Sequence, residues 1–331
     1  MAGIMEINRR ALYNSLRMNW VLDPTLEVEA WQIEDYRSMP VDNLFERLED
    51  KGLYLDKTSF KAYAETVDTP EDLTEALIAD ANVDIQTQDQ VYLLIFELWR
   101  RLLPEKTCVS IFCDEIDHQI HLYDRQQVQN VEAIQDALAN LQVILDENVD
   151  DGADPVEAFE FLDASCANDV ESFLYDFISD QIDNHNNSYA AELLEGFSSY
   201  IHEENWFEFL RARLCAAADL NEANDIIEQL IDDKASEPDL ELNFEMLAYL
   251  VRNGDEKTFS RLVHKTTPLL QNEDDFQVLV SVCIDFYHRL DREAIEKALQ
   301  VILNKREAVS PEKAFSLRDP DLSAFLKFFP S

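Results

Sequence analysis

The chain has 331 residues and a formal net charge of −41, with 27 lysines and arginines against 68 aspartates and glutamates. Its hydrophobic content of 47% is high enough for a large core, so the charge does not indicate a disordered chain. Only 5 glycines are present and they lie far apart, which excludes the glycine-rich motifs of dinucleotide-binding folds, P-loop nucleotide-binding proteins and α/β-hydrolases.

The cysteine pattern and the lack of long apolar runs indicate the cellular compartment in which the protein works. Five cysteines without a Cys-x-x-Cys pair are typical of small buried residues in a reducing environment. The first ten residues contain two arginines with no apolar stretch behind them, so we expect no signal peptide. No run approaches the ~18 apolar residues of a membrane span. These features predict a cytoplasmic protein that does not associate with membranes.

Residues 1–125 are predicted to form an irregular helical N-terminal part. Within them, residues 89–102 place Tyr92, Phe96 and Trp99 on one face of a helix. We expect these aromatic side chains to pack in the core, and a groove that anchors a peptide is the alternative.

Several metal-ligating residue types fall on one predicted helix between residues 108 and 121. Glu115-x-x-His118 matches one element of the carboxylate di-iron bundles. Such a site needs a second Glu-x-x-His, and the nearest partner, Asp285-x-x-His288, has aspartate in place of glutamate. We therefore expect no metal site and no cofactor, and interpret these residues as ordinary core and surface positions.

The acidic segment 146–157, between two predicted helices, has nearly the spacing of a calcium-binding loop. Oxygen ligands occupy its positions 1, 3, 5, 9 and 12, which are Asp146, Asn148, Asp150, Asp154 and Glu157. Position 6, where such a loop needs glycine, is Asp151. We interpret the segment as an acidic turn between helices, and calcium binding is the alternative.

Residues 126–331 are predicted to form an acidic helical-repeat part that packs with the N-terminal part as one body. Eight helices form four pairs: 168–183 with 187–201, 205–217 with 221–232, 239–252 with 255–270, and 273–289 with 291–304. Successive starts in each series lie 34 to 37 residues apart, and seven of the eight starts are asparagine or aspartate, which cap helices well. This period predicts an all-α fold, an α-solenoid of antiparallel helix pairs.

The pattern resembles the tetratricopeptide repeat family over residues 168–304, on the basis of its period and its caps. The residues similar to the aromatic and small positions of that family are Trp206, Phe209 and Ala223. Leu210 stands near the place of the family's glycine, and the terminal proline of the repeat occurs once, as Pro238. The resemblance implies stacked helix pairs with a concave peptide-binding face, and a helical bundle without repeats is the alternative.

The acidic charge is concentrated in the middle of the chain. Between Arg125 and Arg211 no lysine or arginine occurs, whereas 20 aspartates and glutamates do. Residues 257–331, by contrast, have as many basic as acidic residues, which argues against a salt-adapted protein because such a protein would acidify its whole surface. Two interpretations stay open: a solvated face that keeps the protein soluble, and a surface that attracts basic partners.

The acids that we expect to bind a partner lie on and beside the helices at 168–183 and 187–201. They are Asp169, Asp176, Asp180, Asp183, Glu192, Glu195, Glu203 and Glu204. They predict a non-catalytic adaptor, scaffold or chaperone-like module that binds a basic protein or peptide and repels nucleic acid. The alternatives are an inhibitor that imitates nucleic acid and blocks a DNA- or RNA-binding protein, or an all-α metal-dependent enzyme.

Overall fold

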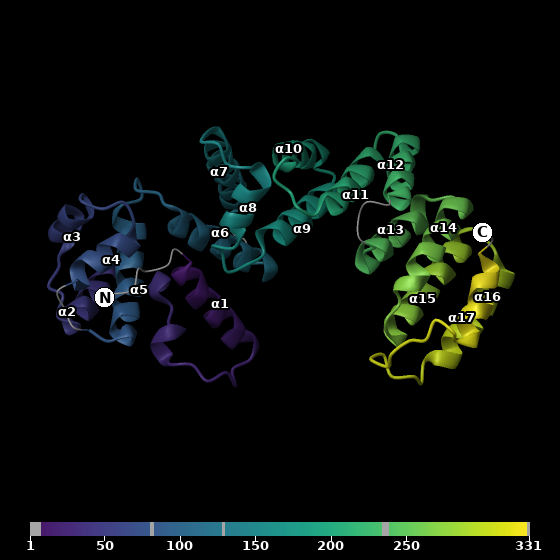
Figure 1. Ribbon diagram of the computed structural model, residues 1–331, viewed down its shortest axis with the longest axis horizontal. Coiled ribbons are helices and arrows are strands. Elements are labelled where there is room, and N and C mark those ends of the chain that lie inside the picture. Colours follow the sequence, from purple (N-terminus) through teal and green to yellow (C-terminus); the bar gives the residue numbers. More distant parts are fainter. Residues whose placement is uncertain (1–7, 80–82, 128–129, 234–237, 330–331) are drawn as a thin grey trace. The chain divides into compact units, whose positions relative to one another are not determined.

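The computed structural model describes residues 8–79, 83–127, 130–233 and 238–329 (Figure 1). In these four ranges the chain forms α-helices and short 3-10 helices, and no β-strand. The predicted all-α fold class is therefore confirmed. None of the helices in the described ranges is both long enough and apolar enough to cross a membrane.

The chain divides into two compact units. The first unit comprises residues 1–174 and 199–201, and the second comprises residues 175–198 and 202–331. This division differs from the predicted boundary at residue 125. Helix contacts explain the difference, because α7 (Val131–Asp150) packs on both α6 (Val109–Asp124) and α8 (Pro155–Asp163).

The first unit is built around one buried helix, α5. Besides α6, α7 and α8, its elements are α1 (Arg9–Leu22), η1 (Ala30–Gln32), η2 (Tyr36–Ser38), α2 (Val41–Asp50), α3 (Lys57–Ala64), α4 (Pro70–Ile78), α5 (Ile85–Leu102) and the start of α9 (Val170–Asp183). Helices α2 and α4 pack on α5. Tyr92, Phe96 and Trp99 of α5 are fully buried, so the prediction that they form core is confirmed and the groove alternative is wrong. Cys113 of α6 is also buried.

The second unit contains the end of α9 and the helices that follow it. After the end of α9 they are α10 (Asn187–Phe197), α11 (Glu204–Cys215), α12 (Leu220–Asp232), α13 (Leu240–Asn253), α14 (Glu256–Thr266), η3 (Thr267–Leu269), α15 (Glu273–Arg289), α16 (Glu293–Arg306), α17 (Pro320–Phe325) and η4 (Leu326–Phe328). Helices α11, α13 and α15 each pack on the helix that follows them, and α13 also packs on α11 and α15 (Figure 1).

The predicted helix starts are correct to within a few residues. Asp239 and Asp255 cap α13 and α14 as expected, each accepting hydrogen bonds from two backbone N–H groups of the first turn. Other caps lie one or two residues earlier than predicted: Asp219 caps α12 and Asn272 caps α15. Helix α12 begins before the predicted cap at residue 221 because the Asp219 side chain already accepts hydrogen bonds from the first free N–H groups of this helix.

A recurring contact links helices of the second unit. In each case a basic side chain in the last turn of one helix binds the C-terminal end of the helix two places earlier. Two of these side chains donate to main-chain carbonyls there, and the third pairs with a carboxylate. The three contacts join Arg213 Nη2 to Asp183 Oδ1 (2.7 Å), Lys265 Nζ to the Ile231 carbonyl, and Arg289 Nη2 to the Gly254 carbonyl (2.6 Å). The paired residues are 30, 34 and 35 positions apart, close to the predicted period.

The core of the second unit is rich in phenylalanine and has a buried ion pair at its edge. Phe259 and Phe286 stack with their ring centroids 3.7 Å apart, and Cys283 is fully buried beside them in the same cluster. At the edge of this core, Arg306 of α16 donates from Nε to Oε1 of Glu273 at 2.6 Å. Arg306 therefore ties α16 to the first turn of α15.

Candidate functional site

The acids predicted to bind a partner are all exposed. On α9, Phe177 and Ile178 are buried while Asp176 and Asp180 face solvent, as the helical spacing predicts. Asp169 belongs to the first unit, where its Oδ1 accepts a hydrogen bond from the Ser172 N–H at 2.8 Å. The acids of the second unit form a surface that we call the acidic surface: Asp176, Asp180, Asp183, Glu192, Glu195, Glu203 and Glu204.

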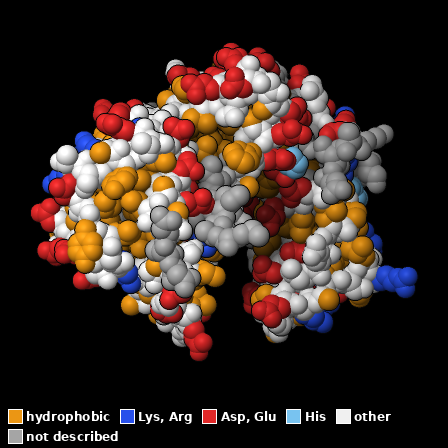
Figure 2. Space-filling view, turned by 60° about the vertical axis from the view of Figure 1, so that its left-hand side comes forward, with side chains coloured by type: hydrophobic (Ala, Val, Ile, Leu, Met, Phe, Trp, Pro, Cys, Tyr) orange, Lys and Arg blue, Asp and Glu red, His pale blue; other side chains and the backbone are white. Residues whose placement is uncertain are grey.

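The acidic surface is not uniformly available to a partner. Asp183 already pairs with Arg213, and Asp176, Asp180 and Glu203 also interact within the chain. Its remaining members, Glu192, Glu195 and Glu204, form no ion pair with any residue in the described ranges. Figure 2 shows that acidic side chains far outnumber basic ones on the face in view. These three glutamates are therefore the best-placed acids for an external cation.

The segment 146–157 does not form a calcium-binding loop. Asp146 and Asp150 lie in the last turns of α7, and Glu157 lies in the first turn of α8. Asp146 also accepts a hydrogen bond from the Tyr200 hydroxyl. Because most of the twelve residues are helical, they cannot wrap around a cation, and only residues 151–154 form the turn. The interpretation as an acidic turn between helices agrees with this geometry.

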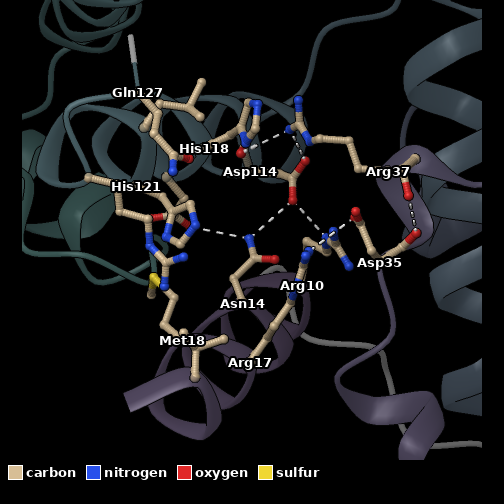
Figure 3. Close-up of a pocket in the computed structure, with 15 residues that line it drawn as sticks. Arg10, Asn14, Arg17, Met18, Asp35, Arg37, Asp114, His118, His121 and Gln127 are labelled. Atoms are coloured by element: carbon tan, nitrogen blue, oxygen red, sulfur yellow. Dashed lines mark hydrogen bonds and ion pairs between the residues drawn. The ribbon is translucent and has the colours of Figure 1, made fainter.

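A second candidate site, which the sequence did not predict, lies inside the first unit. It is a cavity of about 470 Å³ between α1, α6 and the segment that contains η2 (Figure 3). Its basic lining residues are Arg10, Arg17, Arg37, Arg125, His118 and His121. A group of four arginines is unusual in a chain with 27 basic and 68 acidic residues.

Asp114 forms the buried centre of one wall of this cavity. Its Oδ1 accepts from Arg10 Nε at 2.7 Å and from Asn14 Nδ2 at 3.0 Å, and its Oδ2 accepts from Arg37 Nη2 at 2.7 Å (Figure 3). Burial alone would raise the pKa of Asp114, but the charges of Arg10 and Arg37 hold it well below its usual range. This network fixes α1 and η2 against α6.

The residues that suggested a metal site are used within the chain. Glu115 Oε2 pairs with Arg37 Nη1 at 2.9 Å, and Asp285 lies on α15 in the other unit. Across the described ranges, no group of three or more His, Cys, Asp or Glu side chains is placed to hold a metal ion. Burial and the charge of Arg37 lower the pKa of His118, which favours its neutral form.

Asp117 connects α6 to the turn before α9. Its carboxylate accepts hydrogen bonds from the backbone N–H groups of Ala167 (2.9 Å) and Asn168 (3.0 Å), and from the Asn168 side chain (2.8 Å). Burial raises the pKa of Asp117 to about 6, although these hydrogen bonds act to lower it. The protonated form is therefore more favourable in the folded protein than in the unfolded chain.

This raised pKa predicts a local pH dependence of stability. A group whose pKa is higher when folded contributes stability at low pH that is lost as pH rises through the folded value. As pH rises from 4 to 6, the free energy of unfolding of the parent should fall by up to about 3 kcal/mol because Asp117 ionises. Asp117→Asn cannot ionise, so it should not show this fall. Urea unfolding at several pH values measures it, with the exposed Asp136→Asn of α7 as control. If parent and Asp117→Asn have the same pH profile, the assignment is wrong.

Comparison with known protein families, with curated proteins and with solved structures found no match for this chain.

Proposed function

We propose that this protein is a non-catalytic interaction module that binds a basic protein segment through the acidic surface of its second unit. The observation that carries the proposal is the set of exposed glutamates Glu192, Glu195 and Glu204, which form no ion pair within the described residues and lie in a stretch of chain without lysine or arginine up to Arg211. Exposed charges of one sign attract oppositely charged partners and speed their association.

Stacked helix pairs similar to tetratricopeptide repeats would present this surface. Helix starts in the series α9, α11, α13 and α15 lie 34, 36 and 33 residues apart. The recurring cation contacts between alternate helices support the same interpretation, because a stack of similar units produces similar contacts at similar separations along the chain. All five cysteines are free, which supports a reducing compartment such as the cytoplasm.

The test is the binding of a lysine-rich peptide at low ionic strength, followed by fluorescence anisotropy. The triple variant Glu192→Gln, Glu195→Gln and Glu204→Gln should bind it roughly 5- to 150-fold more weakly, because each exposed charge contributes a few tenths to about 1 kcal/mol. Binding by the parent should also weaken steeply as salt is added.

A matched control separates a specific surface from the effect of net charge. The variant Asp285→Asn, Glu307→Gln and Glu312→Gln removes the same three charges from exposed positions elsewhere in the second unit. It should bind the peptide nearly as tightly as the parent. Equal losses in both triple variants would mean that only the total charge matters, and the solubility interpretation of the acidic residues would then be favoured.

A further inference from the structure

We propose that the arginine-lined cavity of the first unit binds a small organic phosphate monoester. The cavity belongs to the first unit, and four arginines and two histidines line it against three aspartates, whereas the whole chain has 27 basic and 68 acidic residues. Arginine recognises phosphate through a planar fork of N–H donors, which lysine does not offer. Four of the residues that line the cavity are permanently cationic, and all four are arginines.

The four arginines are not equivalent. Arg10 and Arg37 are held by the buried Asp114, so their charges are largely compensated. Arg17 pairs with Asp35 at 3.1 Å, but both side chains of this pair are more than 40% exposed, and such pairs exchange partners at little cost. Arg125 forms no ion pair with a residue in the described part of the chain. Two guanidinium groups are thus available to a ligand.

The two available arginines line the same cavity. Arg17 comes from α1, and Arg125 follows the last residue of α6. Two positive charges there match a phosphate monoester, which carries about −1.5 to −2 charges at neutral pH, better than a carboxylate with one.

The size and the apolar lining indicate that the ligand is larger than inorganic phosphate. A volume of about 470 Å³ falls in the range of about 300–1,000 Å³ that is usual for small-molecule sites. Met18 and Val21 of α1 and Leu122 of α6 also line the cavity. These side chains provide an apolar region for the organic group of the ester, next to the arginines that would hold its phosphate.

The experiment uses titration calorimetry on the full chain with three probes: phenyl phosphate, inorganic phosphate and benzoate. Phenyl phosphate should bind most tightly, because it alone combines the dianion with an apolar group. Arg125→Gln and Arg17→Gln should each weaken its binding at least tenfold, as expected for the loss of a hydrogen bond between charged groups. Neither substitution should unfold the protein, since Arg125 is exposed and Arg17 is half-buried.

Arg47→Gln is the matched control. Arg47 lies in the same unit and its side chain is 42% exposed, as is that of Arg17, but it pairs with Glu34 and does not line this cavity. This variant should bind phenyl phosphate like the parent. The proposal is overturned if no probe binds at millimolar concentration, if benzoate binds as tightly as phenyl phosphate, or if Arg47→Gln loses as much affinity as Arg17→Gln and Arg125→Gln.

Discussion

Asp114→Ala is expected to lower the free energy of unfolding of the first unit by about 3–5 kcal/mol, because removing one partner of a buried ion network leaves the others uncompensated. Arg10 is only 8% exposed and would lose its closest carboxylate. Arg37 would keep Glu115 but lose the shorter of its two ion pairs. The remaining buried guanidinium charge is the main source of the expected destabilisation.

Urea unfolding followed by tryptophan fluorescence measures this effect, since Trp20, Trp31 and Trp99 all belong to the first unit. The control is Asp35→Ala, which removes the exposed partner of an arginine in the same unit and should change stability by less than about 1 kcal/mol. If Asp114→Ala cost no more than this control, Asp114 would not be the compensating charge of the buried network.

Arg306→Met is expected to destabilise the second unit by a similar amount, about 3–5 kcal/mol. Glu273 is only 1% exposed and pairs with Arg306 through two donors. Without the guanidinium, its carboxylate would be buried with no opposite charge. The same arginine also binds Asp319 (2.9 Å) and Asp321 (3.2 Å), so the attachment of α17 would loosen as well.

A double variant tests the origin of this loss. Adding Glu273→Gln to Arg306→Met removes the uncompensated charge, and it should restore at least part of the lost stability because a neutral buried group costs less than a charged one. Lys305→Gln, which affects only an exposed lysine that pairs with Asp321, is the control. Chemical unfolding followed by circular dichroism gives all three values. A double variant less stable than Arg306→Met would contradict the explanation.

The helices of the second half could be predicted because their signals are local. Caps such as Asp239 and Asp255 act on N–H groups two or three residues away, and the apolar spacing of α9 is visible within one helix. The exposure of the acids on α9 and α10 followed from the same spacing. The pairing of Asp183 with Arg213 could not be predicted, because the arginine comes from a helix 30 residues further along the chain.

The cavity was missed for the same reason. The sequence drew attention to Glu115 and His118 on α6 as metal-ligating types, but their neighbours come from elsewhere. Arg37 and Arg10 lie 77 and 104 residues from Asp114, and no local pattern connects them. The sequence did contain one signal, since four arginines of a very acidic chain fall on segments that could pack together. Only the tertiary structure shows that these segments do so.

Each unit contains one of the two buried cysteines. Cys113 is 2% exposed in the first unit, and Cys283 is fully buried in the second. Only a thiolate that solvent can reach is alkylated, so a shielded cysteine reacts when the helices around it open. The rate at which iodoacetamide modifies Cys113 therefore reports the opening of one unit, and the rate at Cys283 reports that of the other. The natural chain thus carries a separate chemical probe of opening in each unit.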